Sequence, residues 1–271
     1  MESVQSPAQS AAGIEVRLCH TLAEYEDCLR LEQITWGTGI LVPTAIFVVA
    51  QETGGQIIGA FDKKEMIGFT MALAAIHEGH PSLHSHMTAV LEPYRDKGVG
   101  RALKLFQRQE ALSRKIHLVE WTFDPLELKN ARFNLMRLGA IIRRQIPNCY
   151  GITDSPLHKG MPTDRLVAEW WLDSPRVNRV VSAKTSGESN AYAHATRISI
   201  PNNISDLRTS NKEAAEKIQT QIRQQFASNF ASKMVVTAID SNPTTTDYIL
   251  QPQTQIKTDI FPPREHTNAA L

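Results

Sequence analysis

The stretch Val90-Leu-Glu-Pro-Tyr-Arg95-Asp-Lys-Gly98-Val-Gly100-Arg-Ala-Leu103 lies between a predicted strand and a predicted helix, and it decides the fold. Its two glycines let the backbone turn tightly and bring amides within reach of an anion. The first turn of the following helix has amides without internal partners, and the helix dipole adds positive potential there. Arg95, Lys97 and Arg101 add formal charge around the same point. The stretch therefore predicts an anion site suited to a pyrophosphate.

The glycine pattern alone leaves two interpretations open. One is the anion site, and the other is a strand-to-helix turn that binds nothing, because short glycine patterns are common. The lysine pattern of a Walker loop is missing. The GxGxxG spacing of a dinucleotide-binding fold is incomplete, and no first strand of a βαβ unit opens the domain. The order of the predicted strands and helices around the stretch distinguishes the two interpretations.

Periodicity and capping signals predict a mixed sheet with helices on its faces. Thr21 followed by Glu24 has the spacing of a capping box, which predicts a helix start. The predicted order is β-α-α-β-β-β-α-β-α-β-β. Its strands fall at residues 14–18, 57–61, 66–74, 83–91, 117–123, 140–144 and 165–172, and two of its helices at 101–115 and 129–138.

The composition changes beyond Asp173. Residues 174–196 are rich in Ser, Asn, Ala and Lys and are predicted to be a linker. Residues 197–252 predict a small α/β extension with a helix from Ser210, which has capping-box spacing to Glu213. Such a small unit is unstable alone, so we expect it to pack on the main domain or on a second subunit, as in a homodimer. Residues 1–12 and 253–271 are predicted to be disordered.

Charge and cysteine usage exclude several classes of function. A formal charge of +1 argues against bulk binding to nucleic acid or to an anionic membrane. No apolar run approaches a membrane span, and the polar N-terminus does not resemble a signal peptide. The three cysteines form no CxxC pair, and His77-Glu-Gly-His80 lacks the HExxH spacing. We therefore expect a cytoplasmic protein with reduced thiols, no disulfide framework and no metal site.

The quoted stretch resembles the acyl-CoA-binding motif of the GNAT superfamily of N-acetyltransferases. The element order from about residue 14 to residue 172 also resembles the GNAT order, and Lys129-Asn130-Ala131 through Leu138-Gly139 is similar to the next GNAT motif. Ser85-His86-Met87 and Trp121-Thr-Phe-Asp-Pro125 resemble a GNAT-like group whose substrate does not carry over. The resemblance implies a GNAT domain at residues 14–173, with a mostly antiparallel sheet and helices on both faces.

The resemblance implies that acetyl-CoA, or another acyl-CoA, is the co-substrate. The donor would lie in a V-shaped split between the strand ending near Val90 and the strand of residues 117–123. The acceptor would be the primary amine of a small molecule or a protein. The alternative is a non-catalytic acyl-CoA-binding or sensing module. The residues expected to bind the cofactor are Val90, Arg95, Asp96, Lys97, Gly98, Val99, Gly100, Arg101, Ala102 and Asn130.

The amine must lose its proton, so a base is needed near the thioester. On a strand, residues 84, 86, 88 and 90 share one face, and His86 and His84 are the candidate bases, because imidazole titrates near neutrality. Glu120 on the facing strand is the rival base. Many GNAT enzymes have a tyrosine acid where this chain has Leu135, which leaves Tyr150 as the candidate acid.

Each of these candidates also has a structural interpretation. A strand histidine often only hydrogen-bonds a neighbouring loop, and Glu120 can be a surface carboxylate. Asn130 can equally be the N-terminal cap of its helix. The sequence leaves these alternatives open.

Overall fold

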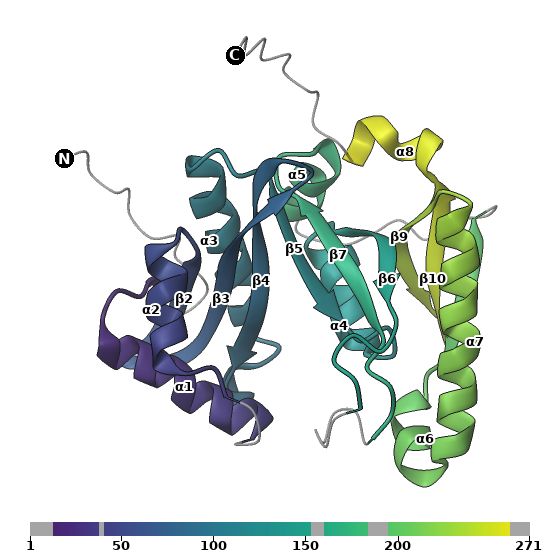
Figure 1. Cartoon of the computed structure of the whole chain (residues 1–271), viewed down its shortest axis with the longest axis horizontal. Helices are drawn as coiled ribbons and strands as arrows, with labels where there is room; N and C mark the ends of the chain where they lie inside the picture. The colour runs from purple at the N-terminus through teal and green to yellow at the C-terminus, as the bar shows by residue number, and fades with distance from the viewer. Residues whose placement is uncertain (1–12, 38–40, 153–159, 184–194, 261–271) are drawn as a thin grey trace. The chain divides into compact units, whose positions relative to one another are not determined.

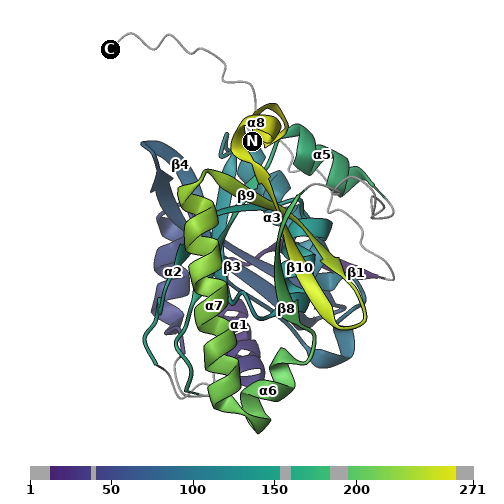
Figure 2. The same cartoon turned by 90° about the vertical axis from the view of Figure 1, so that its right-hand side faces the viewer.

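The predicted order of strands and helices is confirmed between Ile14 and Trp171 in the computed structural model, which describes residues 13–37, 41–152, 160–183 and 195–260 (Figures 1 and 2). The chain divides into two compact units, Met1–Trp121 and Thr122–Leu271. The first unit contains β1 (Ile14–Leu18), α1 (Leu22–Trp36), α2 (Thr44–Glu52), β2 (Gln56–Asp62), β3 (Glu65–His77), β4 (His80–Val90), α3 (Val99–Ser113) and most of β5 (Leu118–Phe123).

The strands of the first unit lie in the order β1-β2-β3-β4-β5. Consecutive pairs from β1 to β4 are antiparallel, and β4 pairs with β5 in parallel. The helix α1 begins at the capping box predicted from the sequence, in which the Thr21 side chain accepts from the Glu24 amide and the Glu24 side chain accepts from the Thr21 amide.

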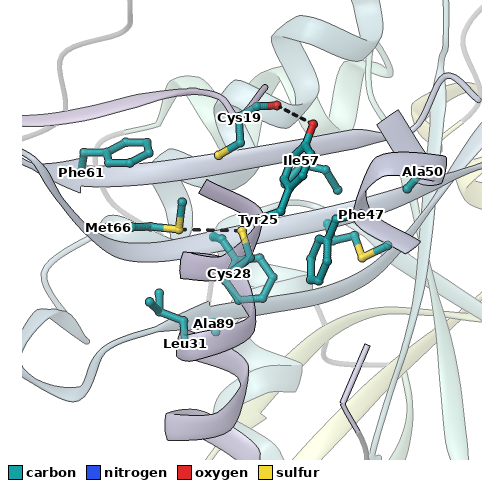
Figure 3. Packing of buried hydrophobic residues seen from close by; sticks show 12 residues of the cluster. Cys19, Tyr25, Cys28, Leu31, Phe47, Ala50, Ile57, Phe61, Met66 and Ala89 are labelled. Atoms are coloured by element: carbon teal, nitrogen blue, oxygen red, sulfur yellow. Dashed lines mark hydrogen bonds between the residues drawn. The ribbon is translucent and has the colours of Figure 1, made fainter. Parts of the chain in front are cut away.

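Two apolar clusters place the helices on opposite faces of this sheet. Cys28 and Leu31 of α1 and Phe47 of α2 pack on Phe69 and Met71 of β3. Figure 3 shows this cluster, with the sulfur atoms of Cys28 and Met66 3.8 Å apart. On the other face, α3 packs through Val99 and Leu103 on the side chains of Val16, Ile58, Ala60 and Ile67. The sheet is therefore buried between α1 and α2 on one side and α3 on the other.

The strands of the second unit lie in the order β7-β6-β9-β10-β8. Its elements are α4 (Leu128–Arg132), a π-helical turn η2 (Phe133–Arg137), β6 (Ile141–Ile146), β7 (Arg165–Trp171), α5 (Pro175–Ser182), β8 (Thr196–Pro201), α6 (Ile204–Ser210), α7 (Lys212–Ala231), β9 (Met234–Ser241), β10 (Thr245–Pro252) and α8 (Gln253–Ile260). The C-terminal extension joins this sheet through β9, which pairs with β6 at Ile142 and Val236. The helix α7 packs along β6, β8 and β9 (Figure 2).

Three expectations about the C-terminal part need correction. The predicted linker at residues 174–196 contains α5, because Ser174 caps a helix that begins with Pro175. Residues 253–260 form α8, although they were predicted to be disordered. The cap of α7 is Asn211, whose side chain accepts from the Ala214 amide, whereas Ser210 ends α6. The predicted disorder of residues 1–12 and 261–271 lies outside the described residues.

The extension is tied to the turn that follows β5. Arg208 of α6 contacts Asp124 at 2.5 Å and Glu127 at 2.9 Å. The Tyr248 hydroxyl of β10 donates to the Pro125 carbonyl at 2.7 Å. Both contacts hold the segment that leads from β5 into α4. In the part of the chain that the structure describes, no helix has the length and apolar character needed to cross a membrane.

Candidate functional site

The N-terminus of α3 begins at a glycine in a left-handed conformation. Gly98 has a φ of +86° and precedes the first helical residue, Val99. Its carbonyl accepts the Ala102 amide at 2.9 Å, so the amide of Ala102 is already used inside the helix. The amides of Val99 and Gly100 belong to the first turn, where helix geometry provides no internal acceptor. The first-turn amides expected from the sequence are present at Val99 and Gly100, and the expected cofactor contact of Ala102 stays a prediction.

The basic side chains of the loop lie at the surface. Arg95 and Lys97 are exposed, and Arg95 donates from Nε to the Val90 carbonyl at 3.0 Å. Lys97 lies over the Tyr94 ring, with its Nζ 5.8 Å from the ring centroid. Asp96, at a φ of +60°, supplies the sharp turn between these cations. The carbonyl of Val90 therefore holds the loop in place, and the charges of the loop remain open to solvent.

The strands β4 and β5 pair over a short distance and then separate. Their register joins Leu83 to Val119 and His84 to Glu120. Within the described chain, no further pairing joins residues 85–90 of β4 to β5. Those β4 residues remain paired with β3 on the other side, so they stay extended. The expected split between the two strands begins at Ser85 and runs to Val90.

A β-bulge at His86 corrects the expected alternation of β4. Met71 of β3 pairs with Met87, and the next residue, Ala72, pairs with Ser85, so that His86 is the extra residue. His84 pairs with Leu73, which packs with the α1 and α2 cluster. Val90 instead packs with the α3 cluster. The prediction that residues 84, 86, 88 and 90 share one face is therefore wrong, because the bulge reverses the alternation.

The bulge gathers the candidate bases at the point where β4 and β5 separate. The rings of His84 and His86 have centroids 6.2 Å apart. Glu120 lies next to His84 in the strand register and is buried, so it is not a surface carboxylate. Its Oε2 is 3.0 Å from Nδ1 of His77 at the end of β3. His77, His84, His86 and Glu120 thus form a polar cluster, which we call the histidine cluster.

The histidine cluster favours neutral imidazole at His86. His86 is an exposed residue, yet partial desolvation of its ring lowers the pKa of this imidazole below its ordinary value. A neutral ring has a lone pair that can accept a proton. Among the described residues, no group of three or more His, Cys, Asp or Glu side chains is arranged to hold a metal ion. The neutral imidazole of His86 can therefore take part in proton transfer.

On the α3 face of the sheet, a buried lysine lies where β4 and β5 separate. Lys104 of α3 donates to the Ser85 hydroxyl at 2.7 Å and to Oε1 of Gln107 at 3.0 Å. Its Nζ also lies 4.4 Å from the centroid of the Trp121 ring. Burial lowers the pKa of Lys104 to about 7. Ser85 and Trp121 follow the last paired residues of β4 and β5, so this lysine lies where the two strands begin to separate.

Two predicted residues lie in the second unit. Asn130 is exposed on α4, and its predicted capping role is wrong, because the N-cap is Glu127. The helix then continues as the π-helical turn η2, which buries Asn134. The Tyr150 hydroxyl is 3.0 Å from Oγ1 of Thr122, and its ring lies under the Arg165 guanidinium at 5.3 Å. The roles expected of Asn130 in cofactor binding and of Tyr150 as an acid stay predictions.

Sequence reasoning missed His77 and Lys104. His77 lies outside the predicted strands 66–74 and 83–91, and nothing in its spacing indicates a contact with Glu120. A signal for Lys104 did exist. The buried residues of α3 are Val99, Leu103, Lys104, Gln107 and Ala111, and residues three, four and seven positions apart share one helix face. A lysine at that spacing falls on the face of the helix that is buried against the sheet.

Comparison with known proteins shows the fold. No family model matches the sequence, and no curated protein matches it by sequence. The structure is similar to that of yncA from Salmonella typhimurium, solved with acetyl-CoA as its cofactor. The two share 15% identity and a TM-score of 0.50, over 66% of this chain and 99% of the other. It is also similar to smu.2055 from Streptococcus mutans UA159, at 19% identity and a TM-score of 0.50, over 59% of this chain and 99% of the other. The chain therefore has the GNAT fold.

Proposed function

We propose that this chain is an N-acyltransferase that moves an acetyl or other small acyl group from CoA to a primary amine. One observation carries the proposal. The separation of β4 from β5 begins beside the histidine cluster, and β4 then leads directly to the glycine-capped start of α3. The proposed anion site and the histidine cluster would therefore lie at the two ends of the β4 segment that does not pair with β5.

The dimensions of that segment suit the donor. The five residue steps from Ser85 to Val90 span about 16 Å at the usual rise of a strand. This length is comparable to that of an extended pantetheine arm. With the pyrophosphate at Val99 and Gly100, the thioester would lie near Ser85 and His86. Unpaired backbone groups of β4 would hydrogen-bond the amides of the arm, as a neighbouring strand does.

The histidine cluster supplies the proton chemistry. The amine nitrogen attacks the thioester carbonyl, the carbon–sulfur bond breaks, and the amine loses a proton. His86, neutral near pH 7, accepts that proton directly or through water. His84 and the Glu120–His77 pair lie beside it and can carry the proton onward. Backbone amides near the bulge would stabilise the charge that develops on the carbonyl oxygen.

The CoA thiolate that leaves would take a proton from a general acid. Leu135 is fully buried and cannot donate a proton, and it stands where many GNAT enzymes have a tyrosine. Tyr150 is half-exposed, and its hydroxyl can donate. Its role as the general acid, like the contact of Asn130 to the cofactor, stays a prediction from the sequence.

A second function is a non-catalytic module that binds acyl-CoA. The missing tyrosine favours it, because a sensor has no need of an acid. The burial of Glu120 against His77 favours an enzyme instead, since a purely binding module gains nothing from a buried proton-accepting pair. We therefore favour the transferase over the non-catalytic module.

Thiol release separates the two functions. The protein is incubated with acetyl-CoA and a panel of amines and of peptides with a free N-terminus or lysine, and free CoA is measured with a thiol reagent. Binding of CoA is measured in parallel by calorimetry. Turnover with any acceptor supports the transferase. Tight binding without turnover across the panel supports the module, and the absence of both overturns the assignment.

Substitution of His86 tests the base. We expect His86→Ala to lower kcat by about 10²- to 10⁴-fold, the usual contribution of general base catalysis, while CoA affinity changes little. Because a base must be deprotonated, kcat of the unmodified protein should fall at pH values below the pKa of His86. His80→Ala is the matched control, because this exposed histidine lies at the other end of β4. Equal activity of the His86 variant and the control would remove His86 as the base.

A further inference from the structure

We infer that Lys104 binds a carboxylate at the distal end of the donor's acyl group, so that the preferred donor is the CoA thioester of a short dicarboxylic acid. This inference rests on the proposed acyl-CoA site and specifies its substrate class. It starts from the lysine on the α3 face, opposite the histidine cluster.

The hydrogen-bond partners of Lys104 are neutral. Only 4% of the residue is exposed, and its amine donates to two neutral oxygens, the Ser85 hydroxyl and Oε1 of Gln107. Within the described chain, no carboxylate lies within ion-pair distance of its Nζ. A nearby acid on α3, Glu110, is held by Arg114 at 2.8 Å and by the Gln56 side chain. An uncompensated buried cation is costly, so the site favours an incoming anion.

A second buried donor lies beside the lysine. Nε2 of Gln107 is buried and has no hydrogen-bond partner among the described residues, while Oε1 of the same amide accepts from Lys104. An ammonium has three protons to donate, and two are used by Ser85 and Gln107. The remaining ammonium proton and the Gln107 amide are both donors, which a carboxylate, having only acceptors, can satisfy together.

Lys104 lies on the helix whose first turn is proposed to bind the pyrophosphate of the acyl-CoA donor. A Cβ on Gly100 would lie 3.9 Å from the Val90 side chain, at the Val90 end of the β4 segment that does not pair with β5. Lys104, one helical turn later, contacts Ser85 at the other end of that segment. The helix α3 thus supplies amides for the pyrophosphate beside Val90 and an ammonium beside Ser85. An acyl chain continuing beyond the thioester on the α3 face would bring its end to Nζ.

The two faces of the sheet separate the two substrates. His84 and Glu120 share the face that carries α1 and α2, whereas Ser85 and Lys104 lie on the α3 face. An amine approaching the histidine cluster would meet the thioester from the first face. The acyl tail would occupy the second. Lys104 therefore acts on the choice of donor, and the base remains on the acceptor side.

Matched donors test the inference. Dissociation constants for succinyl-CoA and glutaryl-CoA are measured by calorimetry without an amine, beside butyryl-CoA and valeryl-CoA, the uncharged acyl groups of the same carbon number. We expect the unmodified protein to bind each carboxylate donor at least about 10-fold more tightly than its uncharged match, the value of one charge-assisted hydrogen bond. Equal affinities would overturn the inference.

Two variants identify the residue responsible. Lys104→Met should abolish the preference and leave the affinity for butyryl-CoA within about 3-fold, because the thioether chain fills similar space. Lys97→Met, on the exposed anion loop, should weaken all four donors by a similar factor. A preference that survives in Lys104→Met contradicts the inference. If CoA itself fails to bind, the proposed function fails with it; if CoA and acetyl-CoA bind but no donor is preferred, only the inference about Lys104 fails.

Discussion

At the scale of single residues, the same physical cause acts on both sides of the sheet. Desolvation lowers the pKa of His86 and of Lys104, and each shift favours the neutral form. For the imidazole, the neutral form is the one that accepts a proton. For the lysine, burial makes the charged form costly, and an anion bound beside it would offset that cost. Burial thus prepares one residue for proton transfer and the other for recognition.

The buried lysine should make stability depend on pH in a defined direction. Its pKa is about 7 in the folded chain and 10.5 when unfolded, so the unfolded state binds the extra proton between these values. The free energy of unfolding should therefore rise with pH, and the penalty of the charged lysine should be complete below about pH 7. Between pH 7 and pH 9 the gain should be about 2–3 kcal/mol, at 1.36 kcal/mol for each unit of pH.

Urea unfolding of the unmodified chain and of Lys104→Met measures this contribution. The methionine variant should be the more stable of the two at pH 7, and the difference should shrink by about 2–3 kcal/mol toward pH 9. Subtracting the two curves removes the titration of all other groups. A difference that stays constant over this range would show that Lys104 remains charged in the folded protein.

At the scale of elements, the start of α3 and the bulge of β4 shape the site. Gly98 turns the chain so that the first amides of α3 point out of the loop, and the bulge at His86 turns the histidines away from the α3 face. The sequence predicted the first feature, because a glycine pattern before a helix is local. It did not predict the second, because a bulge depends on the register with β3, which alternation along β4 alone does not show.

The two glycines of the loop should respond differently to alanine. Gly98 has open space around its Cβ position but a φ of +86°, so Gly98→Ala should cost about 1 kcal/mol of unfolding free energy from backbone strain. Gly100 lies within the first turn of α3, and the nearest atom to its Cβ position is 3.9 Å away. Gly100→Ala should leave the unfolding free energy unchanged or raise it slightly.

The same pair of variants tests the anion site. If the pyrophosphate lies against the first turn of α3, the added methyl of Gly100→Ala should obstruct it and weaken CoA binding by about 10-fold, although the fold is not weakened. Calorimetry with CoA gives the affinity, and urea unfolding gives the stability. CoA affinity that follows stability in both variants would contradict direct contact at Gly100.

At the scale of the whole molecule, the element order was predictable and the tertiary fit of the extension was not. Hydrophobic alternation and the Thr21 capping box are local, and they placed the strands and helices from Ile14 to Trp171. The pairing of β9 with β6 and the contact of Arg208 with Asp124 follow instead from packing between segments distant in sequence. Such contacts also attach the extension to the rest of the second unit. A cation from α6 reaches an acid in the turn after β5.

The Arg208–Asp124 pair should carry much of that attachment. Arg208 is 5% exposed and Asp124 is 7% exposed. Removing Arg208 takes this cation from a buried carboxylate, and removing Asp124 leaves the buried guanidinium with the more exposed Glu127. We expect Asp124→Asn or Arg208→Met to lower the unfolding free energy by about 3 kcal/mol, and the double variant to lose less than the sum of the two. Glu127→Gln is the matched control, because Glu127 contacts the same guanidinium while its side chain is 46% exposed. It should cost at most about 1 kcal/mol. Equal losses from the two acids in urea unfolding would mean that burial does not set the strength of the attachment, and the extension would then be held chiefly by the β6–β9 pairing.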